Sequence, residues 1–216
     1  MKKKNKLTIL YEDKCLLVVY KDYGLPTIKS DKYNNSLYSE VYDYLHKKNQ
    51  KVFVVHRLDK DTSGLVIFAK DDKIKKTLQD NWEKTIRKYY ALVHGQTKRC
   101  DEIISYIKET KTLYSYSTKD KSGELAKTLF KKVNSNKLYT LLDIEIKTGK
   151  KNQIRVHMKD NNTPILGDKK YGKKDGFRHM ALNAYYLCFK HPITKERIEI
   201  DTGIPKEFLS IMKNVK

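Results

Sequence analysis

The chain has 216 residues and a formal net charge of +20 at pH 7, from 46 Lys and Arg against 26 Asp and Glu. Hydrophobic residues make up 39% and aromatic residues 11%, more than a disordered basic tail carries, so the excess charge lies on a folded protein. A polyanionic partner is expected, either nucleic acid or an anionic membrane. No apolar run approaches the roughly 20 residues of a membrane span. The first residues do not continue into a signal peptide, so we expect a cytoplasmic protein.

The predicted secondary structure consists mostly of short β-rich runs, many of which alternate polar with apolar residues. Such alternation favours an antiparallel sheet with one face in water. Three segments have helical spacing instead, the second of them after an Asp71-Asp72 cap and the third after Pro205. In chain order we predict a strand at residues 15–20, a helix at 37–45, strands at 52–56 and 64–69, a helix at 74–82, strands at 89–94, 138–146, 153–158, 185–189 and 197–200, and a helix at 208–212. The fold class is α+β.

Nothing in the chain marks a boundary between domains, because it contains no internal repeat, low-complexity linker or heptad run. We therefore predict one domain over residues 1–216, with a short basic tail at about residues 1–6. The three cysteines, Cys15, Cys100 and Cys188, lie far apart and lack the paired spacing of metal ligands. We predict neither a disulfide framework nor a metal site.

The most informative stretch, residues 54–69, places a dense polar turn between two apolar strands. An ordinary turn explains its Thr-Ser-Gly run, whose hydroxyls and glycine satisfy backbone donors and supply special dihedral angles. An ordinary turn does not explain why Arg57 and Asp59 occur together. Two residues apart on an extended segment, these side chains project to the same side. On physical grounds alone, Asp59 and Asp61 are equally good candidates for a functional carboxylate.

Residues 56–64 read His-Arg-Leu-Asp-Lys-Asp-Thr-Ser-Gly and resemble the His-Arg-Leu-Asp-x-x-Thr-Ser-Gly signature of the RluA-type RNA pseudouridine synthases. Further stretches resemble that family in the same order and spacing: an opening at 9–26, a tyrosine motif at 88–95, a third motif at 148–172 and a segment at 187–192. The resemblance implies a pseudouridine synthase fold, with a mostly antiparallel mixed sheet, flanking helices and a central catalytic cleft. It also implies that Asp59 is the catalytic carboxylate.

The reaction implied by this resemblance explains why the motifs contain these residue types. Pseudouridine forms when the bond from ribose C1′ to uracil N1 breaks, the base turns, C5 bonds to the ribose and the C5 proton leaves. A carboxylate serves as a nucleophile toward C1′ or C6, or as a base at the ribose, and the sequence does not choose among these roles. The reaction requires no cofactor and no metal.

Two further residues take catalytic roles by the same resemblance. Tyr89 matches the motif tyrosine, which stacks on the target uracil and accepts or relays the C5 proton; packing alone is the alternative. Arg155 matches the arginine that pairs with the catalytic Asp, a place suited to an always protonated guanidinium. Phosphate contact from a basic strand is the alternative for Arg155. Arg57 either fills the position that a flipped uridine vacates or forms an ion pair within the turn, and His56 is expected to be structural.

The segment 147–178 is strongly basic, with ten Lys or Arg residues against three Asp and a net charge of +7. A solvated lysine face is the usual reason for such a run. Here aromatic residues are interleaved with the lysines next to Arg155, which favours a groove that follows RNA phosphates. Together with Arg57, the predicted RNA-binding residues are Lys150, Lys151, Lys169, Lys170, Lys173 and Lys174.

The sequence therefore predicts a cytoplasmic RNA pseudouridine synthase that isomerises uridines in structured ribosomal or transfer RNA. We expect a monomer without cofactor, membrane or obligatory protein partner. The main alternative is a non-catalytic RNA-binding or ribosome-assembly factor on the same fold, against which Asp59, Tyr89 and Arg155 together argue. A DNA-binding or membrane-surface protein would need a recognition helix or a basic amphipathic helix, and the sequence has a signature of neither. The sequence names neither the RNA nor the modified position.

Overall fold

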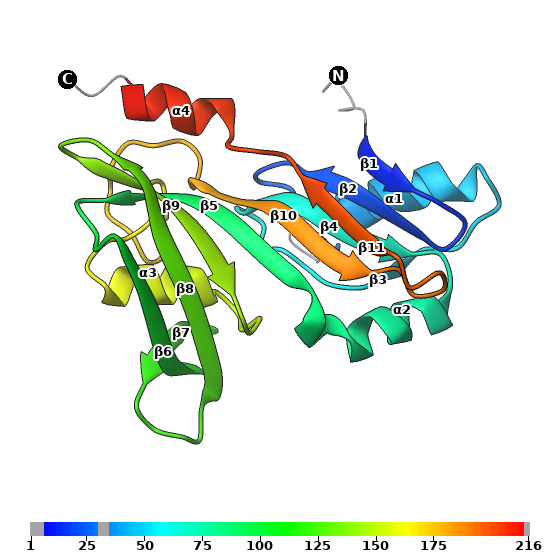
Figure 1. The fold of residues 1–216 in the computed structure, drawn as a ribbon, viewed down its shortest axis with the longest axis horizontal. Coiled ribbons are helices and arrows are strands. Elements are labelled where there is room, and N and C mark those ends of the chain that lie inside the picture. The colour runs from blue at the N-terminus through cyan, green and yellow to red at the C-terminus, as the bar shows by residue number, and fades with distance from the viewer. Residues whose placement is uncertain (1–6, 30–34, 214–216) are drawn as a thin grey trace. The chain divides into compact units, whose positions relative to one another are not determined.

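The computed structural model describes residues 7–29 and 35–213 of the chain (Figure 1). The basic tail predicted at residues 1–6 lies outside these ranges. Of the helices within them, none combines the length and the apolar composition that crossing a membrane requires.

The chain divides into two compact units, and each is described by itself. The first comprises Met1–Thr85 and Cys188–Ile200, and the second comprises Ile86–Leu187 and Asp201–Lys216. The chain passes from the second unit into the first within strand β10 (Leu182–Lys190). A single domain stays a prediction, because two compact units of one chain can fold as one cooperative domain or as two.

The first unit is built around two apolar strands, β2 (Leu16–Lys21) and β4 (Ser63–Ala69), which are buried along almost their whole length. Strands covered on both faces lack a polar alternation, which explains these continuous apolar runs. They pair antiparallel with each other, β1 (Thr8–Glu12) pairs with β2, and β3 (Phe53–Val54) pairs with β4. The remaining elements are α1 (Leu37–His46), α2 (Asp72–Asp80), the 3₁₀ helix η1 (Trp82–Lys84) and β11 (Arg197–Asp201), which begins in this unit and pairs with β10.

The second unit holds a larger antiparallel sheet, drawn mostly in green in Figure 1. Its strands follow the order β10, β5 (Ile86–His94), β9 (Tyr139–Ile146), β8 (Glu124–Ser135), β6 (Cys100–Glu109) and β7 (Ser115–Thr118). Helix α3 (Gln153–Asp160) packs against β7 and β8, and α4 (Lys206–Lys213) packs against β9. Apolar side chains from β5, β9, α3 and α4 form the core, Leu92, Ile144, Met158 and Phe208 among them.

The α+β class is confirmed, since each pair of neighbouring strands from β5 through β9, β8 and β6 to β7 is antiparallel, as are β1–β2 and β2–β4. The three predicted helices are present, and Asp71 caps α2 by accepting from the backbone N–H groups of Lys73 and Ile74. The strand predicted at 52–56 is shorter, since only Phe53–Val54 pairs with a neighbour. Four strands were not predicted: β1, β6, β7 and β8.

The prediction of a strand at 153–158 is wrong, because these residues form the first part of α3. The sequence Gln-Ile-Arg-Val-His-Met alternates polar with apolar residues, which normally indicates a half-wet strand. In α3 all six side chains are buried, and the polar ones have protein partners instead of water. Gln153 bonds to the Lys127 carbonyl and to Thr128 on β8 at 2.9 Å each, so the alternation reflects internal hydrogen bonds.

Candidate active site

Asp59 lies in the loop between β3 and β4 of the first unit, and the backbone of its two neighbours, Leu58 and Lys60, is anchored. The Thr27 hydroxyl donates to the Leu58 carbonyl at 2.8 Å and accepts from the Leu58 N–H at 3.1 Å. The Lys60 carbonyl accepts from the Gly24 N–H at 3.0 Å. Gly24 has φ +77°, a conformation that glycine adopts without strain. The segment before the loop thus fixes the backbone around a half-buried Asp59.

Lys21 is a fully buried lysine beside the same loop. Its ammonium donates to three backbone carbonyls, among them that of Lys60 at 3.0 Å and one at 2.7 Å. Burial lowers the pKa of Lys21 to about 8, although the charges of Asp61 and Asp59 favour its protonated form. At neutral pH the loop therefore lies in the field of a buried cation, which favours ionised carboxylates.

His56 and Arg57 occupy different environments at the start of the loop. The Nε2 atom of His56 accepts from the Ile67 N–H at 3.1 Å, and its ring packs on Trp82 with centroids 4.5 Å apart. These contacts fit the structural role expected for His56. Arg57 is exposed to solvent, which leaves both of its predicted roles open.

Tyr89 lies on β5 of the second unit, half-buried against the core. Because side chains alternate along a strand, Tyr90 points to the opposite face. Tyr90 stacks on Tyr185 with ring centroids 3.8 Å apart, and Tyr185 donates to Asp143 at 3.0 Å. Burial and the charge of Asp143 raise the pKa of Tyr185, which keeps this donor protonated. Tyr90 is therefore held in a stacked pair with Tyr185.

Arg87 is a buried cation near Tyr89 that the sequence analysis did not select. Burial lowers the pKa of its guanidinium, and an electrostatic interaction with Tyr89 opposes that shift. A Cβ at Gly149 would lie 2.9 Å from Nη1 of Arg87, so this close approach favours glycine. The available signal in the sequence was its position, two residues before Tyr89 on the same face of the strand.

Arg155 lies on α3 and is 8% exposed. Its Nε and Nη2 atoms donate to the two carboxylate oxygens of Asp168, each at 2.8 Å, and Nη1 donates to Asn152 at 2.8 Å. The ring of Tyr171 lies 4.9 Å from the guanidinium carbon. Burial alone would raise the pKa of Asp168, but hydrogen bonds and charge from Arg155 hold it below its usual range. The guanidinium therefore has a fixed orientation, in a buried place that does not suit phosphate contact from an exposed strand.

Helix α3 is itself anchored to the sheet by a buried histidine. His157 lies between the hydroxyls of Ser105 on β6 and Thr128 on β8, at 2.9 and 2.8 Å. Burial lowers the pKa of His157 to about 4, so its ring is neutral at pH 7. The neutral ring fixes the helix that carries Arg155 without adding a second charge.

The predicted RNA-binding lysines divide into two groups in the second unit. Lys150 and Lys151 form ion pairs with carboxylates of β8 and β6, each at 2.8 Å. Lys170 donates to a backbone carbonyl at 2.8 Å. The other lysines are exposed and form no hydrogen bond or ion pair with any residue that the structure describes: Lys169, Lys173 and Lys174.

One group of side chains in the described ranges has the spacing of metal ligands, namely Asp13, Cys15 and His191 in the first unit. The Nδ1 atom of His191 accepts backbone N–H groups from Thr194 at 3.0 Å and Ile193 at 3.3 Å. Its Nε2 atom therefore carries the proton and donates to Asp13 at 2.9 Å. Both nitrogens are used, and we assign this group a structural role.

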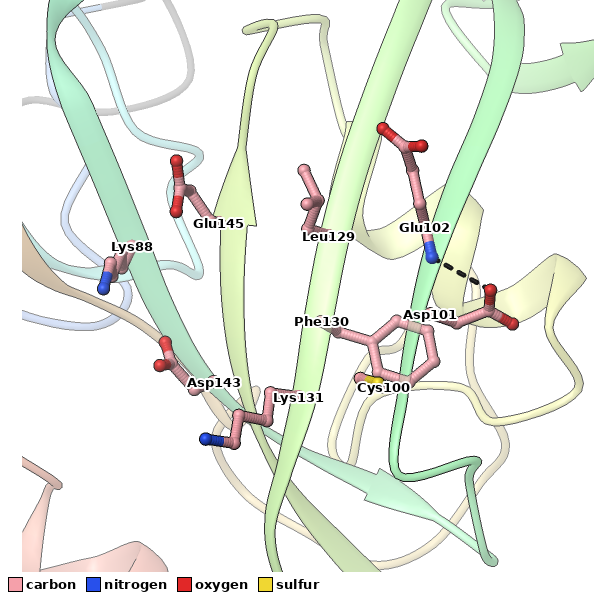
Figure 2. Close-up of a pocket in the computed structure, with 9 residues that line it drawn as sticks. All are labelled: Lys88, Cys100, Asp101, Glu102, Leu129, Phe130, Lys131, Asp143 and Glu145. Atoms are coloured by element: carbon pink, nitrogen blue, oxygen red, sulfur yellow. Dashed lines mark hydrogen bonds between the residues drawn. The ribbon is translucent and has the colours of Figure 1, made fainter.

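A groove of about 360 Å³ runs over β5, β9, β8 and β6 of the second unit (Figure 2). In this view Leu129 lies between the carboxylates of Glu145 and Glu102. The groove contains none of the predicted site residues. Lys88 lines it, and Lys88 points away from the face of β5 that carries Tyr89. The groove is therefore on the other side of the sheet from Tyr89.

Each comparison with known proteins finds similarity to RNA pseudouridine synthases. The family model described as RNA pseudouridylate synthase matches residues 15–160. The chain is 35% identical to YlyB of Bacillus subtilis, described as an uncharacterized RNA pseudouridine synthase, over 97% of this chain and 73% of that protein. It is 33% identical to ribosomal large subunit pseudouridine synthase C of Rickettsia felis, over 93% and 68%. Among solved structures, human RNA pseudouridylate synthase domain containing 4 has a TM-score of 0.77 at 23% identity, over 94% and 90%, a likeness of fold.

Proposed function

The chain belongs to the RNA pseudouridylate synthase family, and from that premise we propose that Asp59 is its catalytic carboxylate, with Tyr89 and Arg155 as its partners in catalysis. The protein is an isomerase that converts uridine in RNA to pseudouridine. The observation that carries the assignment of Asp59 is that the segment before the loop anchors the backbone of both its neighbours, Leu58 and Lys60. A reacting side chain needs such a fixed backbone.

The anionic form of Asp59 is the one that reacts, whether it attacks the nucleotide or removes a proton from the ribose. The ammonium of Lys21 supports this form, because the two side chains attract each other across the loop. The Lys21 ammonium also donates to backbone carbonyls, and these contacts keep the loop close to the positive charge of Lys21. Detachment of the base, its rotation and its rejoining through C5 keep every heavy atom in the nucleotide. The C5 proton leaves and N1 takes up a proton, so the product is an isomer of the substrate.

Tyr89 receives that proton or relays it, while its ring stacks on the uracil. Its position on a paired strand supports this role, since a strand holds a ring more rigidly than a loop does. Arg155 contributes a permanently protonated guanidinium to the reaction. The Asp168 and Asn152 contacts support this role by fixing the direction of a guanidinium that does not lose its proton.

The substrate that we propose is RNA of the large ribosomal subunit. Two relatives are named ribosomal large subunit pseudouridine synthases, C and D, at 33% and 30% identity. Exposed Lys169, Lys173 and Lys174 supply phosphate contacts, and Arg57 contacts the RNA where the uridine leaves its stack. We further propose that the protein acts in the cytoplasm, as a monomer and without a cofactor.

The test measures tritium release from large-subunit ribosomal RNA transcribed with 5-tritiated uridine. Wild type should release label and form pseudouridine. Asp59→Asn should lower turnover at least about a thousandfold, because the change keeps the shape of the side chain but removes the carboxylate anion. RNA affinity and Tm should stay unchanged. Asp61→Asn is the matched control, since it lies in the same loop and also faces the Lys21 charge, and it should keep most activity.

Comparable turnover by the Asp59→Asn variant would reject this assignment. Wild type that binds ribosomal and transfer RNA but forms no pseudouridine in either would instead support the RNA-binding or ribosome-assembly alternative. Conversion of transfer RNA alone would keep the activity and reject the ribosomal substrate.

A further inference from the structure

The turn between β6 and β7 contains a strained and exposed leucine. Leu113 has φ 61° and is 61% exposed. The Leu113 N–H donates to the Thr110 carbonyl at 2.9 Å, and the Thr110 N–H donates to the Tyr114 carbonyl at 2.9 Å, which closes a three-residue hairpin loop. The last position of such a loop is left-handed and normally holds glycine. A leucine there is strained, because in the left-handed conformation its Cβ lies too close to the following carbonyl oxygen.

Several contacts hold this turn in its strained form. The Thr110 hydroxyl accepts from the Tyr114 N–H at 3.1 Å and lies 2.9 Å from the Thr112 hydroxyl. The Lys170 ammonium donates to the Leu113 carbonyl at 2.8 Å. Scattered exposed leucines are common on protein surfaces and need no explanation. A leucine kept in a strained conformation is different, because such strain persists where surroundings enforce it and gathers at functional sites.

Two ammonium groups, those of Lys170 and Lys159, contact the turn. They lie 5.3 and 5.7 Å, respectively, from the centre of the Tyr114 ring, and Lys159 also donates to the Tyr114 hydroxyl at 3.3 Å. Lys111 lies in the turn itself. Within residues 7–29 and 35–213, no ion pair joins these three lysines to a carboxylate. Each ammonium has three N–H donors, more than these contacts use.

The turn is also linked to the helix that carries Arg155. The Tyr114 and Tyr171 rings are 4.9 Å apart, and Tyr171 lies 4.9 Å from the Arg155 guanidinium carbon. Ser115, the first residue of β7, donates its N–H to the Tyr171 hydroxyl at 3.1 Å. A path of aromatic rings therefore runs within the second unit from Arg155 to the turn.

We propose that the turn of residues 110–114 is a second RNA subsite, in which Leu113 packs on an unpaired base beside the target uridine. Lys111, Lys159 and Lys170 neutralise the phosphates next to that base. This proposal rests on the proposed function. An unpaired nucleotide joins a flat apolar face to an adjacent negative charge, which matches an exposed leucine in a turn that the Lys170 and Lys159 ammonium groups contact. An acidic protein segment offers the charge without the flat face, and its binding is an alternative for the test.

The test compares Leu113→Gly and Leu113→Ala for affinity to a labelled single-stranded RNA, for KM and kcat on large-subunit ribosomal RNA, and for Tm. Both variants should weaken RNA binding about fivefold or more, because both remove the packing surface. KM should rise more than kcat falls. Only Leu113→Gly should raise Tm, by about 2 °C, because glycine relieves the strain whereas alanine keeps its Cβ.

Leu138→Ala is the matched control, since Leu138 is 53% exposed in the same unit and lies outside this turn. It should leave affinity and KM unchanged. Lys111→Gln should flatten the dependence of log K on log salt by about 0.7, the value for one phosphate of single-stranded RNA.

Unchanged RNA affinity in both Leu113 variants overturns the subsite, as does an equal loss in Leu138→Ala or a Leu113→Gly variant that gains no stability. Affinity for RNA is measured without turnover, so a wild type that fails to form pseudouridine counts against the proposed function and not against this turn.

Discussion

The two units hold their proposed catalytic side chains in different ways. In the first unit, Thr27 and Lys21 bind the backbone on either side of Asp59. In the second, Asp168 and Asn152 bind the guanidinium of Arg155 itself. The contacts in the first unit fix the backbone of the loop that carries the reacting carboxylate. A guanidinium that acts as a fixed charge has several N–H donors, and its direct contacts with Asp168 and Asn152 fix its direction.

The largest expected effect comes from Asp168→Asn, which breaks the direct contact. Removing one partner of a buried ion pair leaves the other charge uncompensated, so the free energy of unfolding should fall by about 4 kcal/mol. Turnover should fall as well, because Arg155 loses its orientation. Urea unfolding and tritium release measure the two effects. Asp160→Asn, an exposed carboxylate on the same helix, is the control and should change stability by less than about 0.5 kcal/mol.

The pH dependence of this contact has a definite sign. Asp168 has a pKa below its usual value of 3.8 in the folded protein, so its contribution to stability is present above about pH 4. That contribution is lost as the pH falls through the folded pKa. The difference in unfolding free energy between wild type and Asp168→Asn should therefore shrink below pH 4. A difference that stays constant to pH 2 would contradict the ion pair.

The next effect concerns Lys21, whose contribution to stability also rises with pH, but in an alkaline window. The pKa of Lys21 is about 8 in the folded protein against 10.5 for an ordinary lysine. Between these values the unfolded chain binds more protons, so stability rises with pH. Relative to Lys21→Met, wild type should gain about 3 kcal/mol of unfolding free energy between pH 8 and 10.5, with no change below pH 8. Unfolding in urea at pH 7, 8 and 10 tests this, and equal differences at all three would show that Lys21 is not a buried cation.

Thr27→Val tests whether the backbone anchor positions Asp59. The change keeps the shape of the side chain but leaves the buried Leu58 N–H and C=O without their partner, which should cost about 2 kcal/mol of unfolding free energy. Turnover should fall while RNA affinity holds. Thr77→Val removes one exposed hydroxyl contact in α2 and serves as the control. If both variants keep full turnover, the anchoring of Leu58 does not position the catalytic side chain.

The sequence predicted those elements of the fold whose signal is local. The Asp71 cap and the apolar spacing of residues 74 and 78 suffice for α2, and continuous apolar runs suffice for β2 and β4. Strand β8 is hard to predict because its buried face carries small Ala126 and polar Thr128 beside Phe130, while Leu125 and Leu129 lie on the other face. Such a strand has no apolar alternation to detect.

The residues of the candidate site differ in the same way, because some have a local signal in the sequence and others do not. A contiguous motif was enough to select Asp59 over Asp61, which their chemistry did not distinguish. The residues that hold the site were not selected, because Thr27 lies 31 positions from Leu58 and Asp168 lies 13 positions from Arg155. Only the folded chain brings such pairs together. Tyr90 likewise contacts Tyr185, which lies 95 positions farther along the chain.

The smallest expected effect concerns the lysines of the second unit, and it extends the comparison from catalytic side chains to the RNA-binding surface. If about five phosphates are neutralised, the slope of log K against log salt for single-stranded RNA should be near −3.5. Changing Lys169, Lys173 and Lys174 to Gln should flatten this slope by about 2, since each exposed lysine contributes about 0.7. The paired variant of Lys150 and Lys151 to Gln should flatten it less per lysine, because these ammonium groups already face carboxylates at 2.8 Å. Equal effects per lysine would show that ion pairing within the protein does not decide which cations meet the RNA.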